Sequence, residues 1–113
     1  MDLVDWLVEQ GANFDHQDRN GYCALHAAAQ WGHVDVARCL LAAGAETELK
    51  DHFGNTPLWT ASFNARGNYS LVRLLIESGA NPRSLNKVEK SPLDIAATTG
   101  DDKLERELNG KAQ

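Results

Sequence analysis

A turn-and-helix motif recurs along this chain at an almost constant spacing, and that spacing limits the folds open to it. In the segment 51–61, Gly54 suits a turn with positive φ, and Thr56-Pro57 suits the N-cap and first position of a helix. Comparable segments begin at Asp18, 33 residues earlier, and at Asn86, 35 residues later. Glycine-alanine pairs, which suit helix ends, keep the same spacing at 11–12, 44–45 and 79–80. A period near 33 with one turn and two helical stretches predicts stacked helix-turn-helix repeats.

The first residues of each repeat's first helix resemble those of a known family. Its Thr-Pro-Leu-His motif and Gly-His hinge are present in pieces, as Cys23-Ala24-Leu25-His26, Thr56-Pro57-Leu58-Trp59, Ser91-Pro92-Leu93-Asp94 and Gly32-His33. The chain thus resembles ankyrin-repeat proteins, to about Leu108. The resemblance implies an all-α ankyrin-repeat solenoid of stacked helix-turn-helix units joined by β-hairpin-like turns. It implies almost nothing about the identity of a partner.

The length of 113 residues suits one domain, which the motif divides into units. We expect a partial N-terminal repeat at 1–17, a repeat at 18–50, a repeat with a two-residue insertion at 51–85, a C-terminal capping repeat at 86–108 and a tail at 109–113. The insertion falls between the two helices of its unit. The expected helices span residues 2–10, 24–31, 34–43, 57–64, 69–78, 92–99 and 102–108.

The first expected helix, at 2–10, lacks the turn and partner helix that precede it in the other units. The sequence leaves two explanations open: a lone helix that caps the array, or an array cut from a longer one. Apolar groups such as Trp6 would be poorly covered in both cases. We therefore expect a monomer with weak self-association through this helix.

Three polar or aromatic departures from the repeat carry structural expectations. Ser91 and Asp94 have the spacing of a capping box, which fixes the start of a helix. Glu105 and Glu107 occupy positions that are small or apolar in the earlier copies, as expected for the polar outer face of a terminal repeat. Trp59 stands where the motif has histidine, and we expect its side chain to be buried.

Charge and cysteine content disfavour several classes of partner and location. The net charge of −5, without a cluster of lysine and arginine, argues against a nucleic-acid surface. No apolar run is long enough to cross a membrane, and the first residues lack the pattern of a signal peptide. Two cysteines, Cys23 and Cys39, do not make a disulfide framework. We expect both to be reduced thiols in a cytoplasmic protein.

The sequence offers no catalytic or metal-binding motif, so we expect neither an enzyme nor a cofactor or metal site. The spacings Cys-x-x-Cys and His-Glu-x-x-His are absent, as is a glycine-rich phosphate loop after a strand. The resemblance assigns His26 a structural hydrogen bond to a neighbouring turn and places His33 in the hinge. His16 and His52 fall in turns, where solvent exposure is the simpler expectation.

The resemblance places a concave binding face at the turn tips and the ends of the first helices. Large aromatic groups at positions that the fold leaves polar are typical anchors of protein interfaces, although some could instead pack against neighbouring turns. The expected partner-binding residues are Arg19, Asn20, Tyr22, Gln30, Trp31, His52, Phe53, Asn55, Phe63, Asn64, Arg66, Lys87 and Lys90, with Val88, Thr98 and Thr99 on the same face.

Non-enzymatic binding of another protein through this face is therefore the expected function. The segments 56–59 and 63–68, with the last repeat, also resemble small bacterial ankyrin proteins of the toxin-immunity type. That resemblance implies inhibition of a basic toxin, such as a nuclease, by occlusion of its active site, and the acidic net charge would aid the encounter. The alternative is a scaffold or regulatory module, cut from a longer array or complete, without inhibitory activity.

Overall fold

The computed structural model describes residues 15–110, and these contain helices and turns but no strand. The helices are α2 (Ala24–Trp31), α3 (Val34–Ala42), α4 (Pro57–Phe63), α5 (Ser70–Glu77), α6 (Pro92–Thr99) and α7 (Asp102–Leu108). The expected helix at 2–10 and the surface around Trp6 lie outside the described residues. The prediction of an all-α repeat fold is confirmed.

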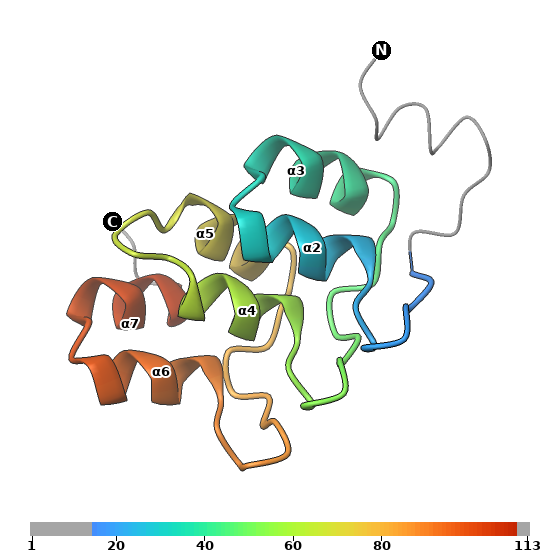
Figure 1. The fold of residues 1–113 in the computed structure, drawn as a ribbon. Coiled ribbons are helices and arrows are strands. Elements are labelled where there is room, and N and C mark those ends of the chain that lie inside the picture. The colour runs from blue at the N-terminus through green and yellow to red at the C-terminus, as the bar shows by residue number, and fades with distance from the viewer. Residues whose placement is uncertain (1–14, 111–113) are drawn as a thin grey trace.

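The six described helices form two layers (Figure 1). The first helices of successive repeats, α2, α4 and α6, pack side by side in one layer, and the second helices, α3, α5 and α7, pack in the other. Each first helix also packs against the second helix of its own repeat. The turns between repeats extend from the same edge of the first layer.

The core lies between these two layers and is built from one leucine set repeated along the stack. Leu25, Leu58, Leu40, Leu75 and Leu108 are fully buried at equivalent positions of successive helices. The helices of the first layer approach one another closely because the buried residues between them are small, namely Ala28, Ala29 and Ala61. Each repeat therefore buries its apolar side only by stacking on a neighbour.

The helix boundaries follow the sequence prediction closely. Three of the expected ranges are observed without change. Helices α3 and α4 end one residue early, and α5 is one residue shorter at each end. The insertion forms a tight turn in which Arg66 and Gly67 have positive φ and the Asn68 N–H donates to the Ala65 carbonyl. The capping box predicted for Ser91 and Asp94 is formed. Helical propensity and capping chemistry thus determine these elements locally.

The three turns at 18–22, 51–55 and 86–90 share one hydrogen-bonding pattern. The first side chain of each turn, Asp18, Asp51 or Asn86, accepts from the N–H groups two and four residues later. Successive turns are joined by backbone bonds: the His52 N–H donates to the Asn20 carbonyl, and the Lys87 N–H donates to the Phe53 carbonyl, both at 2.9 Å. The turn tips are therefore held in a fixed register.

Side chains in the loops that lead into these turns form equivalent hydrogen bonds between the second and third repeats and between the third and fourth repeats. Gln17 donates to the carbonyl of Lys50, 33 residues on, and Lys50 in turn donates to the carbonyl of Leu85, 35 residues on. The carboxylates of Asp15 and Glu48 accept in the same manner from backbone N–H groups of the next loop. Equivalent positions thus carry equivalent inter-repeat bonds, from two carboxylates in one case and from the unlike side chains of Gln17 and Lys50 in the other.

The prediction that Glu107 belongs to a polar outer face is wrong. Only 8% of Glu107 is exposed, and its carboxylate forms a two-bond ion pair with the guanidinium of Arg73 on α5. This hydrogen-bonded cation lowers the pKa of Glu107. Glu107 therefore joins the last two repeats, because it lies on the side of α7 that faces α5. Glu105 is exposed, as expected.

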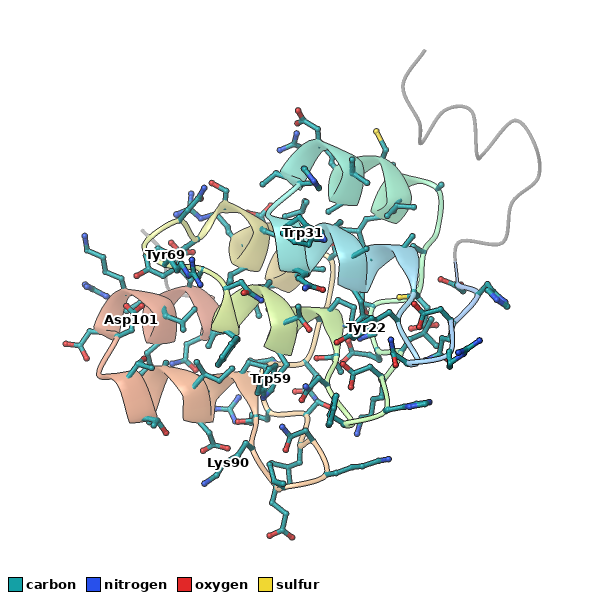
Figure 2. The ribbon with its side chains drawn as sticks, in the orientation of Figure 1. Tyr22, Trp31, Trp59, Tyr69, Lys90 and Asp101 are labelled. Atoms are coloured by element: carbon teal, nitrogen blue, oxygen red, sulfur yellow. The ribbon has the colours of Figure 1, made fainter. Side chains whose placement is uncertain are left out.

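A second polar pair joins the same two repeats. The Tyr69 hydroxyl donates to the carboxylate of Asp101, with oxygen–oxygen distances of 2.9 and 2.8 Å, and Figure 2 shows the two side chains together beside α7. This bond raises the pKa of Tyr69, because ionised tyrosine could no longer donate to the carboxylate. Both inter-repeat side-chain pairs lie on the second-helix layer.

Candidate protein-binding surface

We call the surface formed by the turn tips and the uncovered side of α2, α4 and α6 the inner face; it corresponds to the expected concave face. Of the thirteen expected partner-binding residues, ten are exposed, namely Arg19, Asn20, Gln30, Trp31, His52, Phe53, Phe63, Arg66, Lys87 and Lys90. Tyr22 and Asn64 are half-buried, and Asn55 is buried. Most of the expected set is therefore accessible to a partner.

Large apolar side chains are uncovered at several places on this surface. Trp31 is 70% exposed, Phe53 65%, Phe63 64% and Val88 72%. Phe53 and Val88 lie in turn tips, whereas Trp31 and Phe63 end their helices. Figure 2 shows Trp31 at the end of α2 that is farthest from Tyr22. The exposed apolar groups thus lie at both ends of this surface, two at the turn tips and two at the C-terminal ends of first helices.

Three of the expected residues have structural roles that differ from partner contact. The side-chain carbonyl of Asn55 accepts from the Asn86 amide at 2.9 Å, which joins two successive turns. Asn64 donates from its side chain to the Thr60 carbonyl at the end of α4. The Tyr22 ring packs against the ring of His26, with centroids 5.6 Å apart. Asn55 in particular is withdrawn from the surface, because the next turn stacks over it.

His26 links the second repeat to the third, as the resemblance implied. Its Nε2 lies 2.8 Å from the Asn55 carbonyl, which can only accept, so Nε2 carries the proton. Its Nδ1 accepts from the Cys23 N–H at 3.3 Å, and the Cys23 sulfur lies 3.2 Å from the same nitrogen. Burial lowers the pKa of His26, because the imidazolium would lose hydration in this site. The neutral imidazole is therefore the form that joins the repeats.

Trp59 occupies the position of His26 in the next repeat but does not reproduce its bond. The indole ring stacks on Phe63 at a centroid distance of 5.3 Å and an interplanar angle of 11°. The side chain is half-buried rather than buried as expected. Its Nε1–H is shielded from solvent and finds no acceptor among residues 15–110. The third repeat thus lacks the inner-face hydrogen bond that His26 makes in the second.

A hollow of about 240 Å³ lies beside this aromatic pair, between α4 and α6. Its lining is almost entirely apolar and comes from Trp59, Phe63, Lys90, Asp94, Ile95, Thr98 and Thr99. Figure 2 shows Trp59 between the two helices and Lys90 below α6. Phe63, Lys90, Thr98 and Thr99 were expected on one face, but the sequence did not predict that Trp59 and Ile95 would join them around a hollow.

The described residues contain no group of three potential metal ligands, and none of their helices is long and apolar enough to cross a membrane. Cys23 and Cys39 are free thiols, one buried and one half-buried. Burial raises the pKa of the Cys23 thiol, which opposes formation of a nucleophilic thiolate. The chemistry that this surface offers is therefore contact through aromatic rings, amides and cationic groups.

Comparison with known proteins gives a family and several relatives. A family model described as ankyrin repeats, in three copies, matches residues 1–86. A putative ankyrin repeat-containing protein of Treponema pallidum is 38% identical over 104 residues, which are 91% of this chain and 34% of that protein. Protein phosphatase 1 regulatory subunit 12A of Mus musculus is 43% identical over 95 residues, 84% of this chain and 9% of that protein. Neurogenic locus notch homolog protein 1 of Homo sapiens is 40% identical over 72 residues, 62% of this chain and 3% of that protein. The chain spans about a third or less of these relatives.

Proposed function

The chain belongs to the ankyrin-repeat family, and from this premise we propose that it is a non-enzymatic module that binds another protein through its inner face. Solenoids of this kind use the extended surface along their stack for binding. The observation that carries the proposal is the exposure of Trp31, Phe53 and Phe63, each nearly two-thirds uncovered or more. Exposed rings contribute nothing to the core, and aromatic groups dominate the energetics of protein interfaces.

The stacked turns support this proposal because they hold the surface in a defined shape. Phe53 lies in a turn whose backbone is bonded internally by Asp51 and externally by the Lys87 N–H. A surface whose backbone is already fixed loses little conformational entropy on binding. The tip residues are thus suited to recognition without a change of fold.

The partner-binding set that we propose is the exposed part of the expected set. It comprises Arg19, Asn20, Gln30, Trp31, His52, Phe53, Phe63, Arg66, Lys87 and Lys90. Tyr22 and Asn64 border it, and Asn55 supports it from beneath by fixing the turns. Two unpaired cysteines fit a reducing compartment, so we place the protein in the cytoplasm.

Two versions of this function differ in what binding does to the partner. In the immunity version, the module occludes the active site of a basic toxin, and the net charge of −5 would speed their encounter. In the scaffold or regulatory version, binding does not inhibit. The exposed aromatic groups serve both versions equally, whereas Arg19, Lys87 and Lys90 at the tips would oppose close approach of a basic partner. We therefore favour the scaffold or regulatory version.

Site-specific photo-cross-linking tests the binding face. Phe53→p-benzoylphenylalanine and Phe63→p-benzoylphenylalanine should capture the same protein in cells, identified by mass spectrometry. The matched controls, Arg38→p-benzoylphenylalanine and Glu77→p-benzoylphenylalanine, carry the probe at exposed sites on α3 and α5 and should not capture it. Capture from the control sites alone would place the interface on the second-helix layer and overturn the proposal.

The purified partner then allows the aromatic anchors to be measured. In calorimetric titrations, Trp31→Ala, Phe53→Ala and Phe63→Ala should each weaken binding, at least one by ~2 kcal/mol or more. Arg38→Ala and Glu77→Ala should leave the affinity unchanged. If co-expression protects cells from a toxic partner, and the aromatic substitutions abolish protection, the immunity version is correct; binding without protection supports the scaffold or regulatory version.

A further inference from the structure

We propose that the hollow between α4 and α6 receives an aromatic side chain of the partner, and that Lys90 and Lys87 bind a carboxylate next to that side chain. The proposed occupant is therefore an acidic segment of another protein with an aromatic anchor. This inference rests on the proposed protein-binding function and specifies the chemistry of the partner. It concerns a site that general repeat architecture does not require.

The hollow exists because two residues depart from the pattern of the second repeat. At the positions of Trp59 and Phe63, the second repeat carries His26 and Gln30. His26 is engaged with the next turn through its 2.8 Å contact to Asn55, whereas Trp59 makes no such bond and stacks on Phe63 instead. A buried N–H group without an acceptor lowers stability. The unpaired indole N–H therefore carries a cost in stability, and the aromatic pair provides an uncovered apolar wall.

Polar pairs elsewhere in the same interface join the third and fourth repeats. Tyr69 binds Asp101, and Arg73 binds Glu107, both between α5 and α7. Besides the bond between Asn86 and Asn55 at the turns, the third and fourth repeats are therefore joined by side chains on the second-helix layer, away from the hollow. The inner side of this interface remains open without loss of the connection between repeats.

The size and lining of the hollow fit an aromatic ring. Apolar cavities of about 150 Å³ accommodate benzene, and this one has about 240 Å³. Trp59 and Phe63 form one wall, and Ile95 with the methyl groups of Thr98 and Thr99 forms another. A ring between these walls would gain both apolar burial and offset contact with the stacked pair.

The charged groups at the edge of the hollow determine what lies beside that ring. Lys90 lines the hollow, and Lys87 is exposed in the same turn; neither forms an ion pair within the part of the chain that the structure describes. The acidic neighbours are Asp94 and Glu89. Asp94 already accepts from the N–H and hydroxyl of Ser91, at 2.8 and 3.0 Å. The two lysines therefore supply unused donors, for which a carboxylate is the complementary group.

Selection from a library of random twelve-residue peptides displayed on phage tests the proposal, with the full chain as target. Peptides retained by the wild-type chain and not by Trp59→His should share an aromatic residue next to Asp or Glu. Trp59→His and Phe63→Gln are suitable variants because each installs the residue of the second repeat at the same position. A consensus without an aromatic residue, or one rich in Lys and Arg, would overturn the proposal.

Affinities of one selected peptide then separate the two halves of the site. Phe63→Gln should weaken binding by ~30-fold or more through loss of the aromatic wall. Lys90→Glu should weaken it by on the order of tenfold, with a smaller loss for Lys90→Gln and a weaker dependence on salt in both. Arg38→Ala, at an exposed site on α3 outside the proposed binding set, should not change this affinity. Equal binding to all variants would disprove the hollow as the site, while cross-linking at Phe53 would still report on the wider inner face.

Discussion

Replacement of Gly54 by alanine should reveal how strongly turn stacking contributes to stability. Gly54 has φ near +79°, and a Cβ built there would lie 2.9 Å from the backbone nitrogen of Lys87 and 3.1 Å from the Cα of Asn86. The conformational strain of alanine at positive φ costs ~1–2 kcal/mol. The clash must also displace the next turn, which breaks the bond from the Lys87 N–H to the Phe53 carbonyl and costs ~1 kcal/mol more. We expect Gly54→Ala to lower the free energy of unfolding by ~2–3 kcal/mol in urea titrations.

Two matched variants isolate the clash from the strain. Gly32 has φ near +71° with no atom within 4 Å of an added Cβ, so Gly32→Ala should show the strain alone. Glu89 occupies the position of Gly54 in the last turn at φ near 60°, and Glu89→Ala should change stability by less than ~0.5 kcal/mol. Amide exchange at Lys87 should accelerate in Gly54→Ala only. If Gly54→Ala cost no more than Gly32→Ala, stacking of the turns would not be the constraint on this glycine.

Two further predictions concern polar links between repeats. Burial lowers the pKa of His26 below its value of 6.5 in the unfolded chain. The contribution of His26 to stability is therefore complete above pH 6.5 and decreases as the pH falls from 6.5 through the lowered pKa. His26→Gln should flatten this pH dependence of the free energy of unfolding, measured in urea titrations between about pH 7 and 5.5. Arg73→Met should lower the free energy of unfolding, because it leaves the buried carboxylate of Glu107 without its cation. The double variant with Glu107→Leu, which installs the residue type of Leu74, should recover most of this loss in a double-mutant cycle. Additive losses in that cycle would show that the pair makes no net contribution.

The repeat architecture was predictable because local chemistry specifies each element. A turn and a helix start are predicted within four residues by Gly54, Thr56 and Pro57. In the structure, the Thr56 hydroxyl does accept from the N–H of Trp59. The bonds between loops were not predictable, since Gln17 and Lys50 are unlike side chains at one position. Either can donate to a carbonyl, and only the stacked backbone shows that both do so.

Glu107 illustrates a different reason for failure. A charged residue at the end of a chain of repeats suggests solvent exposure, because an isolated buried carboxylate is costly. The available signal was Arg73, 34 residues earlier, on the facing helix. The position of Arg73 in its repeat does not by itself predict an ion pair. Arg38 and Arg106 occupy the equivalent position in other repeats, and among the described residues neither forms an ion pair with a carboxylate of the next repeat.

The candidate site was only partly predictable for a related reason. Exposure of Trp31, Phe53 and Phe63 followed from positions that the core does not use, but a hollow depends on two helices at once. Trp59 was expected to be buried because it stands at the histidine position of the repeat motif, where the structure does bury His26 in the second repeat. The larger indole cannot place its N–H on the next turn as the imidazole of His26 does, so it stacks on Phe63 and leaves the space beside α6 unfilled.

The two interfaces of the stack therefore divide their polar links differently, and this division bears on function. In the first interface, His26 ties the inner face to the next turn through its 2.8 Å contact with the Asn55 carbonyl. In the second, the Asn86 amide bonds Asn55 between the turns, whereas Tyr69 and Arg73 make ties on the opposite layer. Beside α4 the inner face keeps an open aromatic wall at Trp59 and Phe63. A repeat that needed only stability would have no reason to leave an indole N–H unpaired, since histidine satisfies the same position one repeat earlier. The unpaired indole and the uncovered Phe63 together indicate that this part of the stack is shaped for a partner.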